Sequence, residues 1–218
     1  MNNSESCVSE RLRCILSDIM HNSLFAPFRL VGGTNIALQY SHRESVDIDL
    51  FTDYEYGSLN FKRFEEWFKN KYKYYDSSDS GSKVGMGRTY YIGNDEKDAV
   101  KVDLMYENSK FLYPEIVVDN VRMASLTEIA VMKLNAIYYG GRKKDFWDLH
   151  FLLIDRDYNL KELIALHKKR FPYEHDNEEM MSRLKDFSKA DEEPAPVCRL
   201  GKFWDRIKLD ILDLLLEL

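Results

Sequence analysis

The sequence predicts an α/β (α+β) fold, in which a mixed-sheet core over residues 1–120 is followed by a helical C-terminal lobe over residues 121–218. Short apolar stretches with strand-like alternation, separated by polar turns, predict the core. After Pro114 the apolar residues recur at helical spacing instead, and this change predicts the lobe. With 218 residues and 44% hydrophobic side chains, the chain can bury one core or two modest ones.

Composition also limits the class of protein. The net charge of −6 disfavours a surface that binds nucleic acid all over, although local basic patches stay open. The most apolar stretch, residues 207–218, contains charged side chains, so we expect no membrane span and no membrane partner. The polar N-terminus lacks a signal-peptide pattern, and the three cysteines lack CxxC spacing. We therefore expect a cytoplasmic protein.

The first half of the core is predicted from its apolar patterns. Apolar residues at helical spacing predict a helix over residues 4–22. A short apolar strand is expected over 28–31, and a tight Gly-Gly-Thr turn at 32–34 leads into a brief helix over 35–40. A second strand, over 46–51, has the sequence VDIDLF.

The remaining elements follow from the same criteria. In the core we expect a helix over 59–71, strands over 72–75, 87–93 and 99–106, and turns at 77–82 and 94–95. A capping-box pattern, Ser125 with Glu128, starts the first long helix after Pro114. Beyond Pro114 we expect an extended piece over 116–121, helices over 125–139, 144–154, 160–169, 178–187 and 201–218, and a loop over 189–196.

The strand over 46–51 carries the strongest chemical signal. Because side chains alternate along a strand, its apolar residues point to one face and Asp47 and Asp49 to the other, with their Cα atoms about 7 Å apart. Like charges so close repel unless a cation lies between them, and a hard divalent ion is the usual one. The Gly-Gly-Thr turn presents backbone N–H groups to a phosphate. The pattern predicts a metal–nucleotide site, although exposed strands also carry alternating acids.

Two further residues join this site only if the fold brings them close. Asp103 lies on the polar face of the strand over 99–106. It is either a third carboxylate of the cluster or an exposed strand residue. Lys133 lies within the apolar stripe of the helix over 125–139, so it either extends its amine to the surface or points into a cleft that holds an anion.

A basic cluster beside two acids follows that helix. Arg142 and its two lysine neighbours precede Asp145 and Asp148. A solvated loop explains the cluster, and the helix dipole favours acids in a first turn. Against this, Asp145 and Asp148 face the same way as the apolar Leu149 and Leu152, which indicates a buried role. The histidines show no metal-ligand spacing, and no Ser-His-Asp or Cys-His arrangement stands out.

Together these residues resemble the AbiEii/AbiGii-type toxin nucleotidyltransferases. That family is the abortive-infection branch of the DNA polymerase β-like nucleotidyltransferase superfamily, and the MenT toxins are relatives. The superfamily pattern of an apolar residue, Gly-Gly or Gly-Ser, a helix and Asp-x-Asp stands here as LVGGT over 30–34 and DID over 47–49. The segments 133–137 and 142–149 are similar to this branch as well. Thr34 stands where many members have serine, which keeps the hydroxyl.

The resemblance implies a polymerase β-like nucleotidyltransferase core and a role for each candidate residue. The carboxylates implied to hold two Mg²⁺ ions are those of Asp47, Asp49 and Asp103. Asp103 would also help to deprotonate the attacking hydroxyl. The residues implied to bind the NTP are Gly32, Gly33, Thr34, Lys133 and Arg142. Lys133 would also act in catalysis by neutralising the triphosphate or the transition state, and Asp145 and Asp148 would act by orienting the lysine or the incoming base.

The implied reaction moves an NMP group from an NTP to RNA and releases pyrophosphate, through positioning and metal charge. The tRNA 3′ end is the implied acceptor, and a cognate antitoxin is the implied protein partner. Two other interpretations stay open. One is a small-molecule nucleotidyltransferase of the aminoglycoside-modifying kind, and the other is a non-catalytic member that binds nucleotide or RNA.

Overall fold

The computed structural model describes residues 7–77 and 85–218. Its strands are β1 (Arg29–Leu30), β2 (Asp47–Thr52), β3 (Tyr74–Ser77), β4 (Gly87–Gly93), β5 (Val100–Tyr106), β6 (Ile116–Val118) and β7 (Val121–Met123). Within the described residues these strands form one mixed sheet in the order β3-β4-β5-β2-β1-β7-β6. β2 is antiparallel to β1 and parallel to β5, so both orientations meet at the centre of the sheet.

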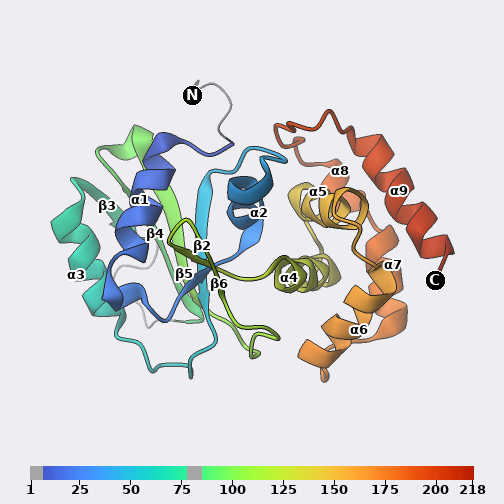
Figure 1. Cartoon of the computed structure of the whole chain (residues 1–218), viewed down its shortest axis with the longest axis horizontal. Helices are drawn as coiled ribbons and strands as arrows, with labels where there is room; N and C mark the ends of the chain where they lie inside the picture. Colours follow the sequence, from blue (N-terminus) through green and yellow to red (C-terminus); the bar gives the residue numbers. More distant parts are fainter. Residues whose placement is uncertain (1–6, 78–84) are drawn as a thin grey trace.

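The helices form two groups (Figure 1). Those in the sheet half are α1 (Glu10–Met20), α2 (Gly32–Tyr40) and α3 (Phe61–Lys71). Those in the C-terminal half are α4 (Leu126–Tyr138), α5 (Lys143–His150), α6 (Leu160–Arg170), α7 (Asn177–Lys185), α8 (Ser188–Asp191) and α9 (Trp204–Leu216). A π-helical turn, Phe151–Asp155, continues α5, and 3₁₀ turns lie at Ser23–Phe25 and Glu96–Asp98. No helix in the described ranges is long and apolar enough to cross a bilayer.

The central strands place their apolar side chains on one face of the sheet. Ile48 and Leu50 of β2 and Val102 and Leu104 of β5 are fully buried, in a cluster with side chains of α1 and α3. The alternate residues of both strands point to the opposite face. In Figure 1, α2 lies between the sheet and the C-terminal helices, and it contacts β2, α4 and α5.

The C-terminal helices share a second core. Ile129 and Leu134 of α4 pack there with Leu149 of α5 and Ile211 of α9, all fully buried. The predicted mixed α/β fold, with its sheet followed by helices, is confirmed. The sheet extends to β7, beyond residue 120, and the division of the chain into two domains stays a prediction.

Two predicted elements were wrong: the turn at 32–34 and the extended piece over 116–121. α2 begins at Gly32, so the Gly-Gly-Thr segment is the first turn of the helix and not a turn before it. The extended piece over 116–121 is a hairpin of β6 and β7. Asp119 and Asn120 connect its strands with φ values of 49° and 63°. Positive φ at both positions is the requirement of a two-residue type I′ hairpin turn.

Several other element bounds differ from the predicted ones or cannot be compared with them. Residues 4–6 of the expected first helix and residues 78–82 of the expected turn lie outside the described ranges. α1 itself begins at Glu10, where the Ser9 hydroxyl accepts a hydrogen bond from the Leu12 N–H at 3.1 Å. The short helix α8 occupies part of the loop expected over 189–196, and α9 is shorter at both ends than the helix expected over 201–218.

Candidate active site

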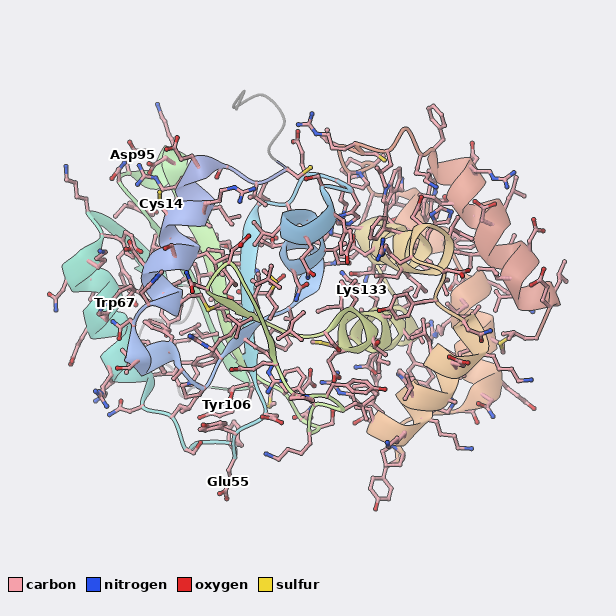
Figure 2. All side chains as sticks on the ribbon, viewed as in Figure 1. Cys14, Glu55, Trp67, Asp95, Tyr106 and Lys133 are labelled. Carbon is pink, nitrogen blue, oxygen red and sulfur yellow. The ribbon has the colours of Figure 1, made fainter. Side chains whose placement is uncertain are left out.

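A cleft of about 350 Å³ lies between the sheet and helix α4. The polar faces of β2 and β5 form one wall, and α4 and the start of α5 form the other. Figure 2 labels Lys133 between these two halves of the molecule, whereas Glu55 points outward at the periphery. The charged side chains that line the cleft are Asp49, Asp103, Glu107, Lys133, Arg142 and Asp145.

The strand register brings the predicted acids together. β2 and β5 are adjacent and parallel, and Asp49 lies directly opposite Asp103. Asp47 lies opposite Lys101, one step toward the start of both strands. Because alternate side chains share a face, all four side chains are on the cleft side of the sheet. The strand of Asp103 therefore does lie beside the strand of Asp47 and Asp49, as the cluster requires.

Negative charge is most crowded at Asp49. Burial, followed by the charges of Asp103 and Asp47, raises the pKa of the Asp49 carboxyl to about 6. Its surroundings thus disfavour the ionised form. A hard divalent cation would reverse this preference, because it takes carboxylate oxygens as ligands and adds positive charge. The chemistry of these donors fits Mg²⁺.

Two lysines already neutralise the neighbouring carboxylates. Lys101 Nζ lies 2.5 Å from Asp103 Oδ2, and the Thr89 hydroxyl donates to Asp103 Oδ1 at 2.6 Å. Lys144 Nζ, from α5, lies 3.5 Å from Asp47 Oδ2. Within residues 7–77 and 85–218, no three potential ligand side chains converge in the arrangement of a finished metal site. The acids share a face, but lysines hold two of them.

Gly32 allows α2 to begin against the acids. Its φ is +70°, and a Cβ atom there would lie 2.4 Å from Asp49 Oδ2. A side chain at this position would therefore be strained by the backbone and would collide with the carboxylate. The sequence pattern of a glycine before Asp-x-Asp reflects this close approach.

The first turn of α2 also offers donors. Its backbone N–H groups have no partners within the helix, which makes a helix N-terminus suitable for a phosphate. The Thr34 hydroxyl does not face the cleft in this way, because it is buried and contacts the Ser45 hydroxyl at 2.8 Å and the Asp47 carbonyl oxygen. A contact of Thr34 with phosphate therefore has to come from its backbone N–H.

Lys133 points into the cleft instead of extending to the surface. Its amine lies 2.7 Å from Asp145 Oδ1 and 2.8 Å from Asp148 Oδ2. Burial acts to lower the pKa of Lys133, but these two carboxylates outweigh it and the pKa is raised. The lysine is therefore charged and held in place by the two predicted acids of α5. Arg142 remains half exposed beside them, and its backbone N–H donates to Asp145 Oδ2 at 3.1 Å.

Asp148 is the centre of a buried network that the sequence did not predict. Arg43 binds it with two parallel contacts, Nε to Oδ1 at 2.6 Å and Nη2 to Oδ2 at 2.7 Å. His42 Nε2 lies 2.7 Å from Oδ1. Burial lowers the pKa of His42, so a neutral imidazole donates its Nε2 hydrogen. Gly33 makes room for this network, since a Cβ there would lie 2.0 Å from Arg43 Nη2.

The C-terminal segment fixes the position of Arg43. The Arg199 N–H donates to the His42 carbonyl at 3.0 Å, and the Glu44 N–H donates to the Val197 carbonyl at 2.9 Å. A side-chain ion pair joins Arg199 to Glu44 at 2.5 Å. The only sequence signal for Arg43 is its place between the Gly-Gly helix and Asp-x-Asp, and this says nothing of its burial against α5.

Comparisons with known proteins identify the family of the chain. The model of the nucleotidyl transferase AbiEii toxin family of type IV toxin–antitoxin systems matches residues 14–215. An uncharacterized protein of Aquifex aeolicus (strain VF5) is 31% identical over 152 residues, a match that spans 66% of this chain and 66% of that protein.

Solved structures share the fold. MenT4, a nucleotidyltransferase toxin of Mycobacterium tuberculosis H37Rv, aligns with a TM-score of 0.60 at 12% identity, over 95% of this chain and 84% of that one. JHP933 of Helicobacter pylori aligns with a TM-score of 0.54 at 21% identity, over 96% of this chain and 92% of that one. The predicted family and enzyme class are confirmed. The chain belongs to the nucleotidyl transferase AbiEii toxin family of type IV toxin–antitoxin systems.

Proposed function

We propose that this nucleotidyltransferase is metal-dependent and moves an NMP group from an NTP to an RNA acceptor, with the tRNA 3′ end as the expected target. The observation that carries the proposal is the pairing of Asp49 with Asp103 on adjacent strands, in a cleft whose other wall presents Lys133. Acids on one wall and a fixed cation on the other match the needs of a triphosphate with its metal ions.

Asp47, Asp49 and Asp103 are the residues that would hold Mg²⁺. The bound ions would supply charge neutralisation to the triphosphate and to the attacking oxygen. Asp103 is suited to take part in accepting the proton of the acceptor hydroxyl, because Thr89 holds one carboxylate oxygen and so orients the group.

Lys133 and the start of α2 would bind the phosphates. The lysine is charged and kept in position by Asp145 and Asp148, so it offers positive charge without reorganisation during the reaction. Gly33 and Thr34 supply backbone donors, and Arg142 adds a second, more exposed cation at the cleft. Pyrophosphate is the leaving group, and its negative charge develops next to these donors.

The acceptor is tested by offering the four α-³²P-labelled NTPs with Mg²⁺ and three acceptors: total tRNA, an aminoglycoside panel and protein. We expect label on tRNA with the purified wild-type chain. Label on an aminoglycoside instead would favour the small-molecule enzyme, and label on no acceptor would favour a non-catalytic binding member. Asp49→Asn, which removes the central carboxylate, serves as the inactive control for each acceptor.

The biological role follows from the family. We propose that the chain acts in the cytoplasm as the toxin of a toxin–antitoxin or abortive-infection system, and that an antitoxin protein opposes it. Induced expression of the wild-type chain should arrest growth, whereas Asp49→Asn at equal protein level should not. Growth arrest by both proteins would show that toxicity does not depend on nucleotidyl transfer. A small open reading frame beside the gene, when co-expressed, is expected to restore growth.

A further inference from the structure

We propose that Lys101 is an internal counter-ion of the acid cluster, and that a metal ion has to displace its ammonium group from Asp103 in order to bind. This inference rests on the proposed metal-dependent function. It assigns Lys101 a positioning role that keeps the carboxylates together before a metal ion binds and sets the affinity of the site for divalent cations.

Lys101 is placed for this role by the strand itself. It precedes Asp103 by two residues on β5, so both side chains share the cleft face. Its amine lies 2.5 Å from Asp103 Oδ2, and the register puts it opposite Asp47. Asp103 and Asp47, together with Asp49, are the carboxylates whose charges act on this lysine. Its positive charge thus acts on all three acids, and it contacts Asp103 directly.

Both carboxylate oxygens of Asp103 are already in contact with other side chains. The Thr89 hydroxyl holds Oδ1 at 2.6 Å, while Lys101 holds Oδ2. A cation that approaches Oδ2 competes with the ammonium for the same oxygen, and the two positive charges repel. Binding is therefore an exchange of cations. About a third of the Lys101 side chain is exposed, 33%, so the displaced amine has solvent to move into.

This exchange explains why the acids share a face without forming a finished metal site. Lys144 holds Asp47 in a similar way, but from helix α5 instead of the sheet and at 3.5 Å. Its longer contact predicts a smaller effect on metal affinity than that of Lys101. Lys101 and Lys144 therefore offer an internal comparison, because they have the same side chain and charge but lie at different distances from the carboxylate that each contacts.

The test is a titration of the full-length, nucleotide-free chain with Mn²⁺. Binding is measured by calorimetry and by the electron paramagnetic resonance signal of free Mn²⁺. Lys101→Met should lower the Kd for Mn²⁺ roughly two- to fivefold, the size expected for one partly exposed charge. Lys144→Met should lower it less. Lys101→Arg, which keeps the charge, and Lys62→Met, on the exposed face of α3, should match the wild type.

The inference is overturned if folded Lys101→Met binds Mn²⁺ no more tightly than the wild type. If Lys101→Met does not fold, Lys101→Gln takes its place, and a Kd equal to that of Lys101→Arg overturns the inference in the same way. Asp49→Asn separates this failure from failure of the proposed function. If Asp49→Asn abolishes Mn²⁺ binding, the proposed metal site stands, whatever the result for the Lys101 variants. Binding that Asp49→Asn leaves unchanged contradicts the site itself.

Discussion

Arg43 and Asp148 form a two-contact ion pair across 105 residues of sequence, with N–O distances of 2.6 and 2.7 Å. The pair joins the segment before β2 to helix α5 and is almost completely buried. Lys133 of α4 contacts the same carboxylate at 2.8 Å. Lys133 is thus held by carboxylates of α5, and one of these carboxylates, Asp148, is itself held by Arg43 from the segment before β2.

Asp148→Asn should destabilise the protein by about 3–5 kcal/mol, because it leaves the buried charges of Arg43 and Lys133 without their shared partner. Urea unfolding at pH 7 measures this. Arg43→Lys should also destabilise, since an ammonium cannot make the two parallel contacts. The control is Glu55→Gln, which removes one exposed acid. Its free energy of unfolding should stay within about 0.5 kcal/mol of the wild type. A loss under 1 kcal/mol for Asp148→Asn would contradict a structural role for the network.

The same carboxylate predicts a pH dependence. Although burial acts to raise the pKa of Asp148, Lys133 and Arg43 outweigh it and hold the pKa well below the ordinary value. A depressed pKa contributes stability that is present above the unfolded value, about 3.9, and is lost as the pH falls below it. The stability gap between wild type and Asp148→Asn should therefore narrow as the pH falls below about 4. A gap that does not narrow below about pH 4 would contradict this assignment.

Asp49→Asn should have the opposite effect on stability. The pKa of Asp49 is raised from 3.8 to about 6, so the folded state binds this proton more tightly than the unfolded chain does. Stability is therefore lost as the pH rises from about 4 to 6. At about 1.4 kcal/mol for each tenfold change in proton affinity, the loss is at most about 3 kcal/mol. Metal-free Asp49→Asn should be the more stable protein at pH 8, and the two should converge near pH 4 in thermal unfolding. Equal stability at pH 8 would show that the carboxylates do not repel as described.

Gly32→Ala should abolish nucleotidyl transfer, because the new Cβ would lie 2.4 Å from Asp49 Oδ2. Gly57→Ala is the matched control: Gly57 has φ of +79°, but a Cβ there meets nothing within 4 Å. Both variants carry the strain of a left-handed alanine, about 1 kcal/mol. Only Gly32→Ala should lose activity in a pyrophosphate-release assay. Equal activity in the two variants would exclude a close packing of α2 on the acids.

Lys133→Met should lower kcat about 10²- to 10³-fold, the usual loss when one preorganised cation or donor is removed from a transition state. It also leaves Asp145 and Asp148 side by side without their shared cation, so stability should fall too. Circular dichroism separates the two effects. Lys168→Met, exposed on α6, is the control. A folded Lys133→Met protein with kcat within threefold of the wild type would remove the lysine from the mechanism.

How much of this site is visible in the sequence depends on the range of the contact. The shared face of Asp47 and Asp49 follows from strand alternation alone and could be predicted. Asp103 required knowledge of which strands are neighbours, because alternation gives its face but not its partner. The role of Lys133 stayed undecided for a similar reason: a lysine in an apolar stripe points to the surface or into a cleft according to what packs against it.

Other features of the site and the fold were not predicted from the sequence. His42 and Arg43 meet α5 only through tertiary packing, and no local pattern marks them as buried. The hairpin at Asp119 and Asn120 carried a recognisable signal, since these residue types tolerate positive φ. The start of α2 at Gly32 is less apparent, because two glycines usually indicate a turn and are accepted here for their small size beside Asp49 and Arg43.

Nucleotidyl transfer is tested most directly by comparing NTP labelled with ³²P at the α-phosphate and at the γ-phosphate, in parallel reactions with tRNA and Mg²⁺. Transfer of a nucleotidyl group predicts label on the RNA 3′ end from the α-position only, with the γ-label released as pyrophosphate, and predicts no label with Asp49→Asn. Label on RNA from the γ-position, or α-label that persists in Asp49→Asn, would contradict the role of the paired aspartates.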